Sequence, residues 1–191
     1  MSARIQLPKP SGPYRIGVMD FELTDTSREE TFSPGTTRRI PVRAWYPTAA
    51  EDGVPRANAK PAELLHQVVP FFKLIPTSTD VSALLDVSTH AWEDAPPLMG
   101  TRRPVLIFSH GGFACPQTNI MPVEHFASHG YVVLSISHPY VDQATLHENG
   151  DIIKCHPSLL EDLTATAAKP SYVAAFSAPD PAARLDAMLI N

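Results

Sequence analysis

The sequence predicts an α/β fold with a mixed, mostly parallel sheet, and three consecutive features support this prediction. The apolar run Val105–Phe108 is typical of a strand that is buried on both faces of a parallel sheet. Gly111–Gly112 follows it and lets the backbone turn or approach a ligand closely. Glu124–His129 then favours a helix that stops at Gly130, and Tyr131–Ile136 is a second apolar run. The order predicts a βαβ unit whose glycine loop lies at the carboxyl edge of the sheet, where ligands of open α/β sheets bind.

An antiparallel hairpin is expected before this unit. Tyr14–Leu23 and Arg39–Tyr46 both alternate apolar and polar residues, as half-buried strands do. The polar stretch Asp25–Thr37 between them predicts the turn. Pro41 cannot donate a ladder hydrogen bond, so it is expected near a sheet edge or at the start of a strand, and we expect the hairpin to flank the parallel sheet at its edge.

Residues 48–100 are predicted to form a helical and loop insertion. Ala62–Val69 and Val81–Val87 are the helix candidates. A connection of this length in a compact domain is usually a lid or a pocket wall, so that role is expected. A packed helical excursion with no contact to substrate explains the pattern equally well.

The remainder of the chain is predicted to be a loop and two helices. Tyr140–Pro157 favours a loop with a tight turn at Asn149–Gly150. Ser158–Ala168 favours a helix in which Ser158 is the N-cap and Glu161 the N3 residue, and Ala182–Ile190 favours a last helix.

Composition limits the class of protein. A chain of 191 residues suits one domain, and its net charge of −5 without a basic stripe argues against a nucleic-acid partner. No apolar segment is long enough to span a membrane, and no signal peptide is seen at the start. We therefore expect a cytoplasmic protein in which Cys115 and Cys155 are reduced.

A series of short motifs runs through most of the chain: Gly12-Pro13-Tyr14, Gly17, Asp25-Thr26-Ser27-Arg28, Arg43-Ala44-Trp45-Tyr46-Pro47, Pro104 to Gly111, Ala127 to Val133, and His138. In this order and spacing they resemble the platelet-activating factor acetylhydrolase group of α/β-hydrolases, with dienelactone hydrolases and bacterial esterases as broader relatives. The resemblance implies an α/β-hydrolase fold, carboxylic ester hydrolysis by a serine nucleophile, and no cofactor.

The resemblance also assigns roles to the glycine loop. In α/β-hydrolases one oxyanion donor comes from a His-Gly motif in this position. The family pattern puts the donor on the backbone N–H of Gly112, with Phe113 as the second candidate. His110 is expected to brace the loop by hydrogen bonds. The side chains of Phe113 and His138 are expected to line the substrate pocket.

The nucleophile, the acid and the base are not found in this sequence. A hydrolase of this fold needs a Gly-x-Ser-x-Gly elbow, followed by the acid and then the histidine. No such pentapeptide is present, while Arg184 and Asp186 resemble a pair in the helix before the elbow. Residues 1–191 are therefore expected to be the amino-terminal portion of one hydrolase domain, incomplete at the carboxyl terminus.

Other candidate nucleophiles and a metal site have weaker support in the sequence. Ser109 follows a strand but not a strained strand-to-helix turn, and no sequence feature activates Cys115 with His110 as base. His125 and His129 share a helix face but lack the glutamate of a zinc-binding His-Glu-x-x-His motif. The remaining histidines that invite a metal hypothesis are His110, His138, His147 and His156.

Three functions stay open from the sequence. The chain is part of a serine esterase, a catalytically inactive remnant or binding module, or a cysteine- or metal-dependent enzyme. The expected substrate is a small ester or a phospholipid-like ester. A partial sheet also exposes an unpaired edge, so self-association through that edge is expected.

Overall fold

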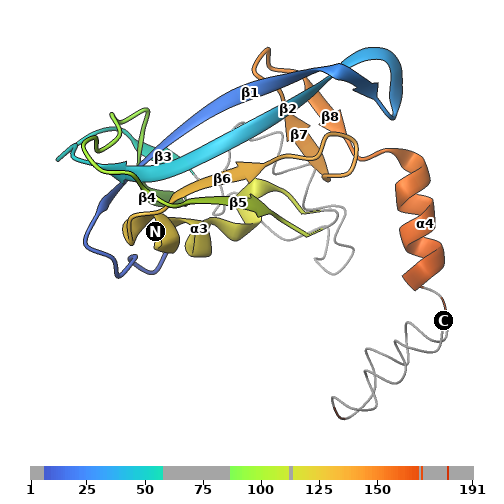
Figure 1. The fold of residues 1–191 in the computed structure, drawn as a ribbon. Helices are drawn as coiled ribbons and strands as arrows, with labels where there is room; N and C mark the ends of the chain where they lie inside the picture. Colours follow the sequence, from blue (N-terminus) through green and yellow to red (C-terminus); the bar gives the residue numbers. More distant parts are fainter. Residues whose placement is uncertain (1–6, 58–86, 112–113, 168, 170–179, 181–191) are drawn as a thin grey trace, which may run out of the picture. The chain divides into compact units, whose positions relative to one another are not determined.

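A computed structural model describes residues 7–57, 87–111, 114–167, 169 and 180 (Figure 1). The chain divides into two compact units, residues 1–154 and residues 155–191. The second unit contains helix α4, Pro157–Ala167. All the described strands belong to the first unit, which also carries every residue of the candidate site.

The first unit is built on a six-stranded mixed sheet with the order β3-β4-β1-β2-β6-β5. Its strands are β1 Arg15–Glu30, β2 Ser33–Thr48, β3 Pro55–Ala57, β4 Ser88–Glu93, β5 Val105–Ser109 and β6 Val132–Ile136. The pairs β5–β6 and β1–β4 are parallel, and the pairs β1–β2, β2–β6 and β3–β4 are antiparallel. Within the described residues the parallel pairs are therefore a minority.

The predicted βαβ unit is confirmed. β5 and β6 are adjacent and parallel, with Val105 opposite Val132 and Ser109 opposite Ile136. They are joined through the 3₁₀ helix η2, Pro116–Asn119, and helix α3, Ile120–Ser128. Gly130 ends the helix with a φ of +100°, a conformation that glycine adopts without steric cost.

The hairpin forms as predicted, but its expected place at the sheet edge is wrong. β1 also pairs with β4, and β2 also pairs with β6, so the hairpin lies inside the sheet. Pro41 is tolerated because it comes directly before Val42, the first β2 residue paired with β6. Only its carbonyl is used there, accepting the N–H of Ser137 at 2.9 Å.

The strands of the hairpin are longer than predicted. They continue to Glu30 and resume at Ser33, so the polar stretch is mostly strand and not turn. A register irregularity after Asp25 accommodates it, and the Asp25 carboxylate accepts hydrogen bonds from Ser27 and from Arg28 Nε. These residues form a two-stranded ribbon that is largely exposed to solvent, which explains why they lack strand-like alternation.

One face of the sheet packs against α3, which lies below it in Figure 1. The core consists of side chains from β1, β2, β4, β6 and α3: Ile16, Val18, Trp45, Ala91, Ile120, Val123, Ala127 and Val133. Trp45 is 1% exposed and lies directly between Val18 of β1 and Val133 of β6 in the sheet register. This residue ties the hairpin to the βαβ unit.

Two of the glycines in the motifs allow close approaches. A Cβ on Gly12 would lie 2.1 Å from the carbonyl oxygen of Ser128, and the Gly12 N–H donates to Ser128 Oγ at 3.1 Å. A Cβ on Gly17 would lie 2.6 Å from the ring of Tyr46 on the neighbouring strand. The missing side chain of Gly12 therefore lets the chain before β1 contact α3, and that of Gly17 lets the Tyr46 ring lie over β1.

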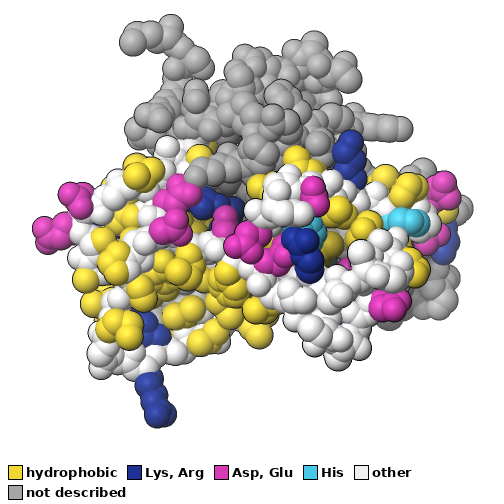
Figure 2. Space-filling model, turned by 90° about the horizontal axis from the view of Figure 1, so that it is seen from above, with side chains coloured by type: hydrophobic (Ala, Val, Ile, Leu, Met, Phe, Trp, Pro, Cys, Tyr) yellow, Lys and Arg dark blue, Asp and Glu magenta, His cyan; other side chains and the backbone are white. Residues whose placement is uncertain are grey.

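β5 was expected to be buried on both faces, and this expectation is wrong. Among the described strands, β5 lies at the edge of the sheet, and the side chains of Val105 and Ile107 are 57% and 72% exposed. Figure 2 views the molecule from the side opposite α3 and shows hydrophobic side chains gathered on that surface.

The other predictions have mixed outcomes. The insertion at 48–100 contains the strands β3 and β4, which sequence reasoning missed. The helices predicted at Ala62–Val69 and Ala182–Ile190 lie outside the described residues, as does nearly all of Val81–Val87. The turn at Asn149–Gly150 is confirmed, but it joins two strands, β7 Ala144–Leu146 and β8 Ile152–Lys154. α4 starts at Pro157, so Ser158 is inside the helix and not its cap.

Candidate active site

The candidate site lies where β5 and β6 end. Ser109 and Ile136 are paired in the register, so the loops that follow the two strands start side by side. The first loop holds the glycines and the second holds His138 and Asp142. This is the carboxyl edge of a parallel strand pair, where α/β proteins place their ligands.

Ser109 and His138 are brought together by this arrangement. Ser109 Oγ and His138 Nε2 are 2.8 Å apart, within the reach that a nucleophile and its base require. Burial, and then the positive charge of Arg38, lower the pKa of His138. In the described part of the chain, however, no carboxylate orients the His138 ring, because Asp142 accepts the backbone N–H of His138 instead. Within the described residues, the pair is therefore not completed to a triad.

His110 is buried at the start of the glycine loop. Its Nδ1 lies 3.2 Å from the carbonyl oxygen of Gly111, and the bracing role of His110 stays a prediction. Its Nε2 lies 3.4 Å from Oδ1 of Asp142. Burial lowers the pKa of His110, so the imidazole is mostly neutral near pH 7.

The Gly111 carbonyl also closes the loop. It accepts the backbone N–H of Ala114 at 3.1 Å, so His110 and Ala114 converge on one oxygen. Gly112 and Phe113, the predicted oxyanion donors, lie outside the described residues. Their roles, and the role of His138 as a substrate contact, stay predictions.

Asp142 is a site residue that sequence reasoning missed. It is 1% exposed, and its Oδ2 accepts the N–H of His138 at 2.8 Å and the hydroxyl of Thr145 at 3.0 Å. Burial raises the pKa of Asp142 to about 7, against the lowering effect of these two hydrogen bonds. The available signal was an aspartate in a short loop directly after a strand that neighbours the glycine loop.

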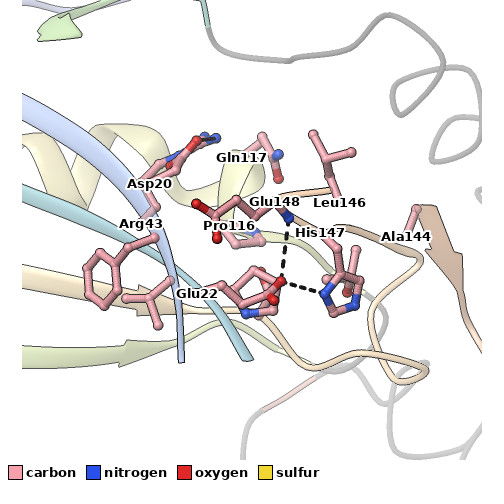
Figure 3. A pocket seen from close by; sticks show the side chains of 14 residues that line it. Asp20, Glu22, Arg43, Pro116, Gln117, Ala144, Leu146, His147 and Glu148 are labelled. Carbon is pink, nitrogen blue, oxygen red and sulfur yellow. Dashed lines mark hydrogen bonds and ion pairs between the residues drawn. The ribbon is translucent and has the colours of Figure 1, made fainter. Parts of the chain in front are cut away.

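A pocket of about 280 Å³ opens next to the two loops (Figure 3). Pro116 and Gln117 line it from the segment after the glycine loop, and Ser137 lines it from the end of β6. Its opposite wall comes from β1, β2, β7 and the residues after β7, and it combines apolar side chains with Glu22 and His147, which are drawn in contact. Its size is near the lower limit for small-molecule pockets.

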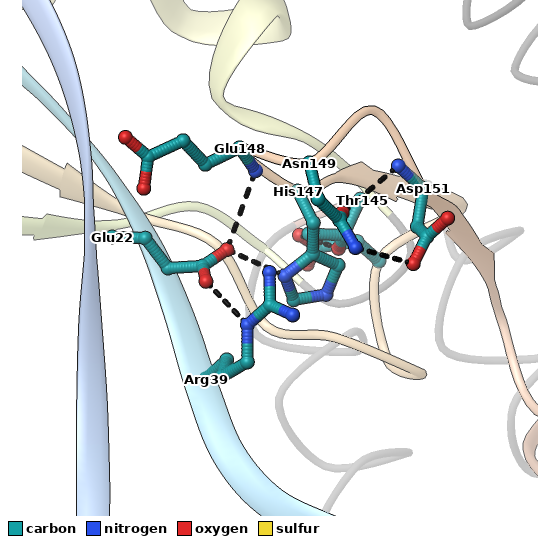
Figure 4. Close-up of polar contacts among 8 residues, drawn as sticks. Glu22, Arg39, Thr145, His147, Glu148, Asn149 and Asp151 are labelled. Atoms are coloured by element: carbon teal, nitrogen blue, oxygen red, sulfur yellow. Dashed lines mark hydrogen bonds and ion pairs between the residues drawn. The ribbon is translucent and has the colours of Figure 1, made fainter.

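An ion-pair network stabilises that wall (Figure 4). Glu22 of β1 pairs with Arg39 of β2 and with Nδ1 of His147, which is 2.6 Å away. Burial opposes the ionisation of Glu22, but the hydrogen bonds from Arg39, His147 and the Glu148 N–H outweigh it, so the pKa of Glu22 is lowered. The carboxylate therefore stays ionised and links the ribbon to the β7–β8 hairpin.

The cysteine and metal alternatives gain no support. Burial raises the pKa of the Cys115 thiol to about 11, so almost no thiolate is present at neutral pH. Cys115 and Cys155 are both buried, and neither forms a disulfide bond within the described residues. The rings of His125 and His129 are 4.7 Å apart, yet no group of three or more potential ligands is placed for a metal in the part of the chain that the structure describes.

Comparison with known proteins supports the resemblance. A curated relative, the "Probable 1-alkyl-2-acetylglycerophosphocholine esterase" of Arthroderma benhamiae, is 27% identical over 160 residues, which cover 77% of this chain and 40% of the relative. The ferulic acid esterase from Streptomyces cinnamoneus superposes with a TM-score of 0.70 at 26% identity, over 91% of this chain and 47% of the esterase. The chain thus spans less than half the length of either protein.

The fold and the family follow from these matches. The mixed six-stranded sheet and its esterase neighbour identify an α/β-hydrolase fold. The family model for "Platelet-activating factor acetylhydrolase, isoform II" matches residues 1–146, which include the hairpin, the glycine loop and Asp142. This chain belongs to the platelet-activating factor acetylhydrolase, isoform II, family.

Proposed function

We propose that this chain is the amino-terminal portion of a carboxylic ester hydrolase and that it contributes one side of the oxyanion hole. The observation that carries the proposal is the position of the His110 loop at the carboxyl edge of β5, closed by the Ala114 N–H on the Gly111 carbonyl. Family membership supplies the chemistry, because hydrolases of this fold take an oxyanion donor from this loop.

The adjacent pocket supports a compact substrate. Its volume of about 280 Å³ is too small for a long acyl chain together with a head group. The carboxylates of Asp20, Glu22 and Glu148 line it, and two of them are paired with cationic side chains, Asp20 with Arg43 and Glu22 with Arg39. We propose an ester with a short acyl group, and a phospholipid-like alcohol is compatible because the pocket is open to solvent.

The 191-residue chain by itself is expected to show no hydrolysis of p-nitrophenyl acetate above background and no labelling by a fluorophosphonate probe. The reason is that an oxyanion donor stabilises a charge that only an activated nucleophile can create. The measurements are the initial rate of hydrolysis and in-gel fluorescence of the labelled chain. Stoichiometric labelling that disappears in Ser109→Ala would instead identify the Ser109–His138 pair as a working dyad.

The positive test is a chimera that joins residues 1–191 to the carboxyl-terminal part of the Arthroderma benhamiae relative, called here the completed hydrolase. It should hydrolyse p-nitrophenyl acetate and label with the probe, because the elbow and the triad are then present. A folded chimera that labels at its elbow serine yet has no turnover would contradict the proposal that this chain supplies a functional oxyanion hole.

Self-association is proposed to involve the β5 edge. Ile107→Lys, which places a charge on this exposed strand, should lower the dimeric and larger fraction of the 191-residue chain in light scattering after size exclusion. Met121→Lys is the matched control, because Met121 is a half-exposed apolar residue of α3. Equal association of both variants and the parent chain would exclude the β5 edge as the contact.

A further inference from the structure

His110 and Asp142 present two buried polar atoms to each other. The His110 side chain is fully buried and the Asp142 side chain is 1% exposed. His110 Nε2 and Asp142 Oδ1 are 3.4 Å apart, and neither atom has another hydrogen-bond partner. Buried polar atoms are rarely left unpaired, because the loss of their water costs free energy. One proton placed between them would satisfy both.

The other hydrogen bonds of the pair decide where that proton lies. The Gly111 carbonyl can only accept, so His110 Nδ1, 3.2 Å away, has to carry a hydrogen. A neutral imidazole with a hydrogen on Nδ1 has a lone pair on Nε2. An ionised Asp142 would also present a lone pair, and the two atoms would repel each other. The contact is favourable when the Asp142 carboxyl group carries the proton and donates it to Nε2.

We propose that Asp142 is a positioning residue of the oxyanion loop: its protonated carboxyl group donates to His110 Nε2 and holds the imidazole in the tautomer whose Nδ1–H binds the Gly111 carbonyl. That carbonyl also accepts the Ala114 N–H, so the chain of hydrogen bonds from Asp142 ends at the closure of the loop. The effect of this loop on catalysis rests on the ester hydrolase function proposed above. The proposed tautomer of His110 does not depend on that function.

The surroundings of Asp142 favour the neutral pair. Its Oδ2 is used by the His138 N–H and the Thr145 hydroxyl, so only Oδ1 is left for His110. Among the described residues, the titratable groups near it include His110, the His138 ring, which lies 5.1 Å from the His110 ring, and the thiol of Cys115. Burial lowers the pKa of both histidines and raises the pKa of Asp142 to about 7, so an imidazolium–carboxylate pair is disfavoured.

The arrangement should respond to pH. Below pH 7 the pair holds two protons, one on Asp142 and one on His110 Nδ1. When Asp142 loses its proton to solvent, the carboxylate favours the other tautomer, in which Nε2–H donates to Oδ1. His110 Nδ1 then has no hydrogen for the Gly111 carbonyl, and the brace on the loop is lost.

The direct test is ¹⁵N NMR of the histidine side chains in the 191-residue chain, which needs no enzymatic activity. At pH 6, the ¹⁵N chemical shifts of His110 should be those of a protonated Nδ1 and of an unprotonated Nε2 that accepts a hydrogen bond. The pattern should change toward the Nε2–H tautomer with a midpoint near pH 7. Two protonated nitrogens at pH 6, or the Nε2–H tautomer at every pH, would overturn the proposal.

Asp142→Asn keeps the shape of the carboxyl group and a hydrogen-bond donor but removes the titratable proton. The amide group can donate to His110 Nε2 while its oxygen accepts from His138 and Thr145, so His110 should keep the Nδ1–H tautomer from pH 6 to pH 8.5. The matched control is Glu124→Gln, which changes another carboxylate that is 1% exposed and whose pKa burial raises. That carboxylate accepts the His90 N–H and is not bonded to His110, so the control should keep the parent titration. A His110 titration that survives in Asp142→Asn would assign it to another group.

Activity adds an independent readout in the completed hydrolase. Its kcat should fall as pH rises through about 7, and Asp142→Asn should remove that fall while KM changes little. Asp142→Ala, which removes the donor, should lower kcat about tenfold or more at pH 6, the scale of a misplaced catalytic group. Unchanged kcat in Asp142→Ala would refute the positioning role. An inactive parent chimera would reject the proposed function and leave the NMR result to decide the tautomer.

Discussion

Replacing Gly112 by proline in the completed hydrolase is expected to lower kcat by about two to three orders of magnitude. Proline has no backbone N–H, so the change removes the donor that the family pattern assigns to this position. A single oxyanion donor contributes about 3 kcal/mol to transition-state stabilisation, and its loss appears in kcat more than in KM. The measurement is steady-state hydrolysis of p-nitrophenyl acetate, with circular dichroism to verify the fold.

Gly112→Ala is the matched control for this result, since alanine keeps the N–H and changes only the side chain. It should retain most of the kcat. A second comparison, Phe113→Pro, tests the neighbouring candidate. If Gly112→Pro keeps near-normal kcat and Phe113→Pro loses it, then the donor is Phe113 and the assignment to Gly112 is wrong.

The parts of the fold that could be predicted from the sequence are those determined by local signals. The apolar runs of β5 and β6, the glycines between them and the stop at Gly130 each depend on neighbouring residues, and all three are found. The place of the hairpin within the sheet depends instead on pairing with β4 and β6. Pro41 was misleading because a proline also fits an interior strand at the point where its neighbour ends.

The residues of the candidate site also divide into those that a local sequence signal predicts and those that only long-range contacts determine. His110 was found because it belongs to a recognisable His-Gly motif, and its bond to the adjacent Gly111 is local. Asp142 reaches His110 from a different loop, and Glu22 reaches His147 from 125 residues away. Neither contact has a sequence pattern, since a carboxylate in a polar loop is ordinarily solvated. Burial of Val105 and Ile107 was overestimated because an apolar run does not reveal whether another element covers it.

Replacing Trp45 by alanine is expected to lower the free energy of unfolding by about 3–5 kcal/mol, the usual cost of emptying a buried aromatic site. The side chain is 1% exposed and packs in the single cluster that joins four strands to α3. Because domains of this size have only about 5–15 kcal/mol of stability, most of it would be lost. The measurement is urea denaturation of the 191-residue chain followed by far-ultraviolet circular dichroism.

Met19→Ala provides the control for the Trp45 experiment, because Met19 lies on the same hairpin, in β1, but is 38% exposed. Met19→Ala should lower the free energy of unfolding by about 1 kcal/mol or less, since a partly solvated side chain gains less free energy from burial. Trp45→Phe should fall between the two, as it keeps an aromatic ring but leaves a smaller void. In the completed hydrolase, probe labelling at elevated temperature should decrease most in Trp45→Ala, less in Trp45→Phe and least in Met19→Ala. The reason is that Trp45 connects the hairpin to β6, whose end carries the His138 loop. A loss below about 1 kcal/mol in Trp45→Ala would mean that α3 and the sheet do not share this core in solution.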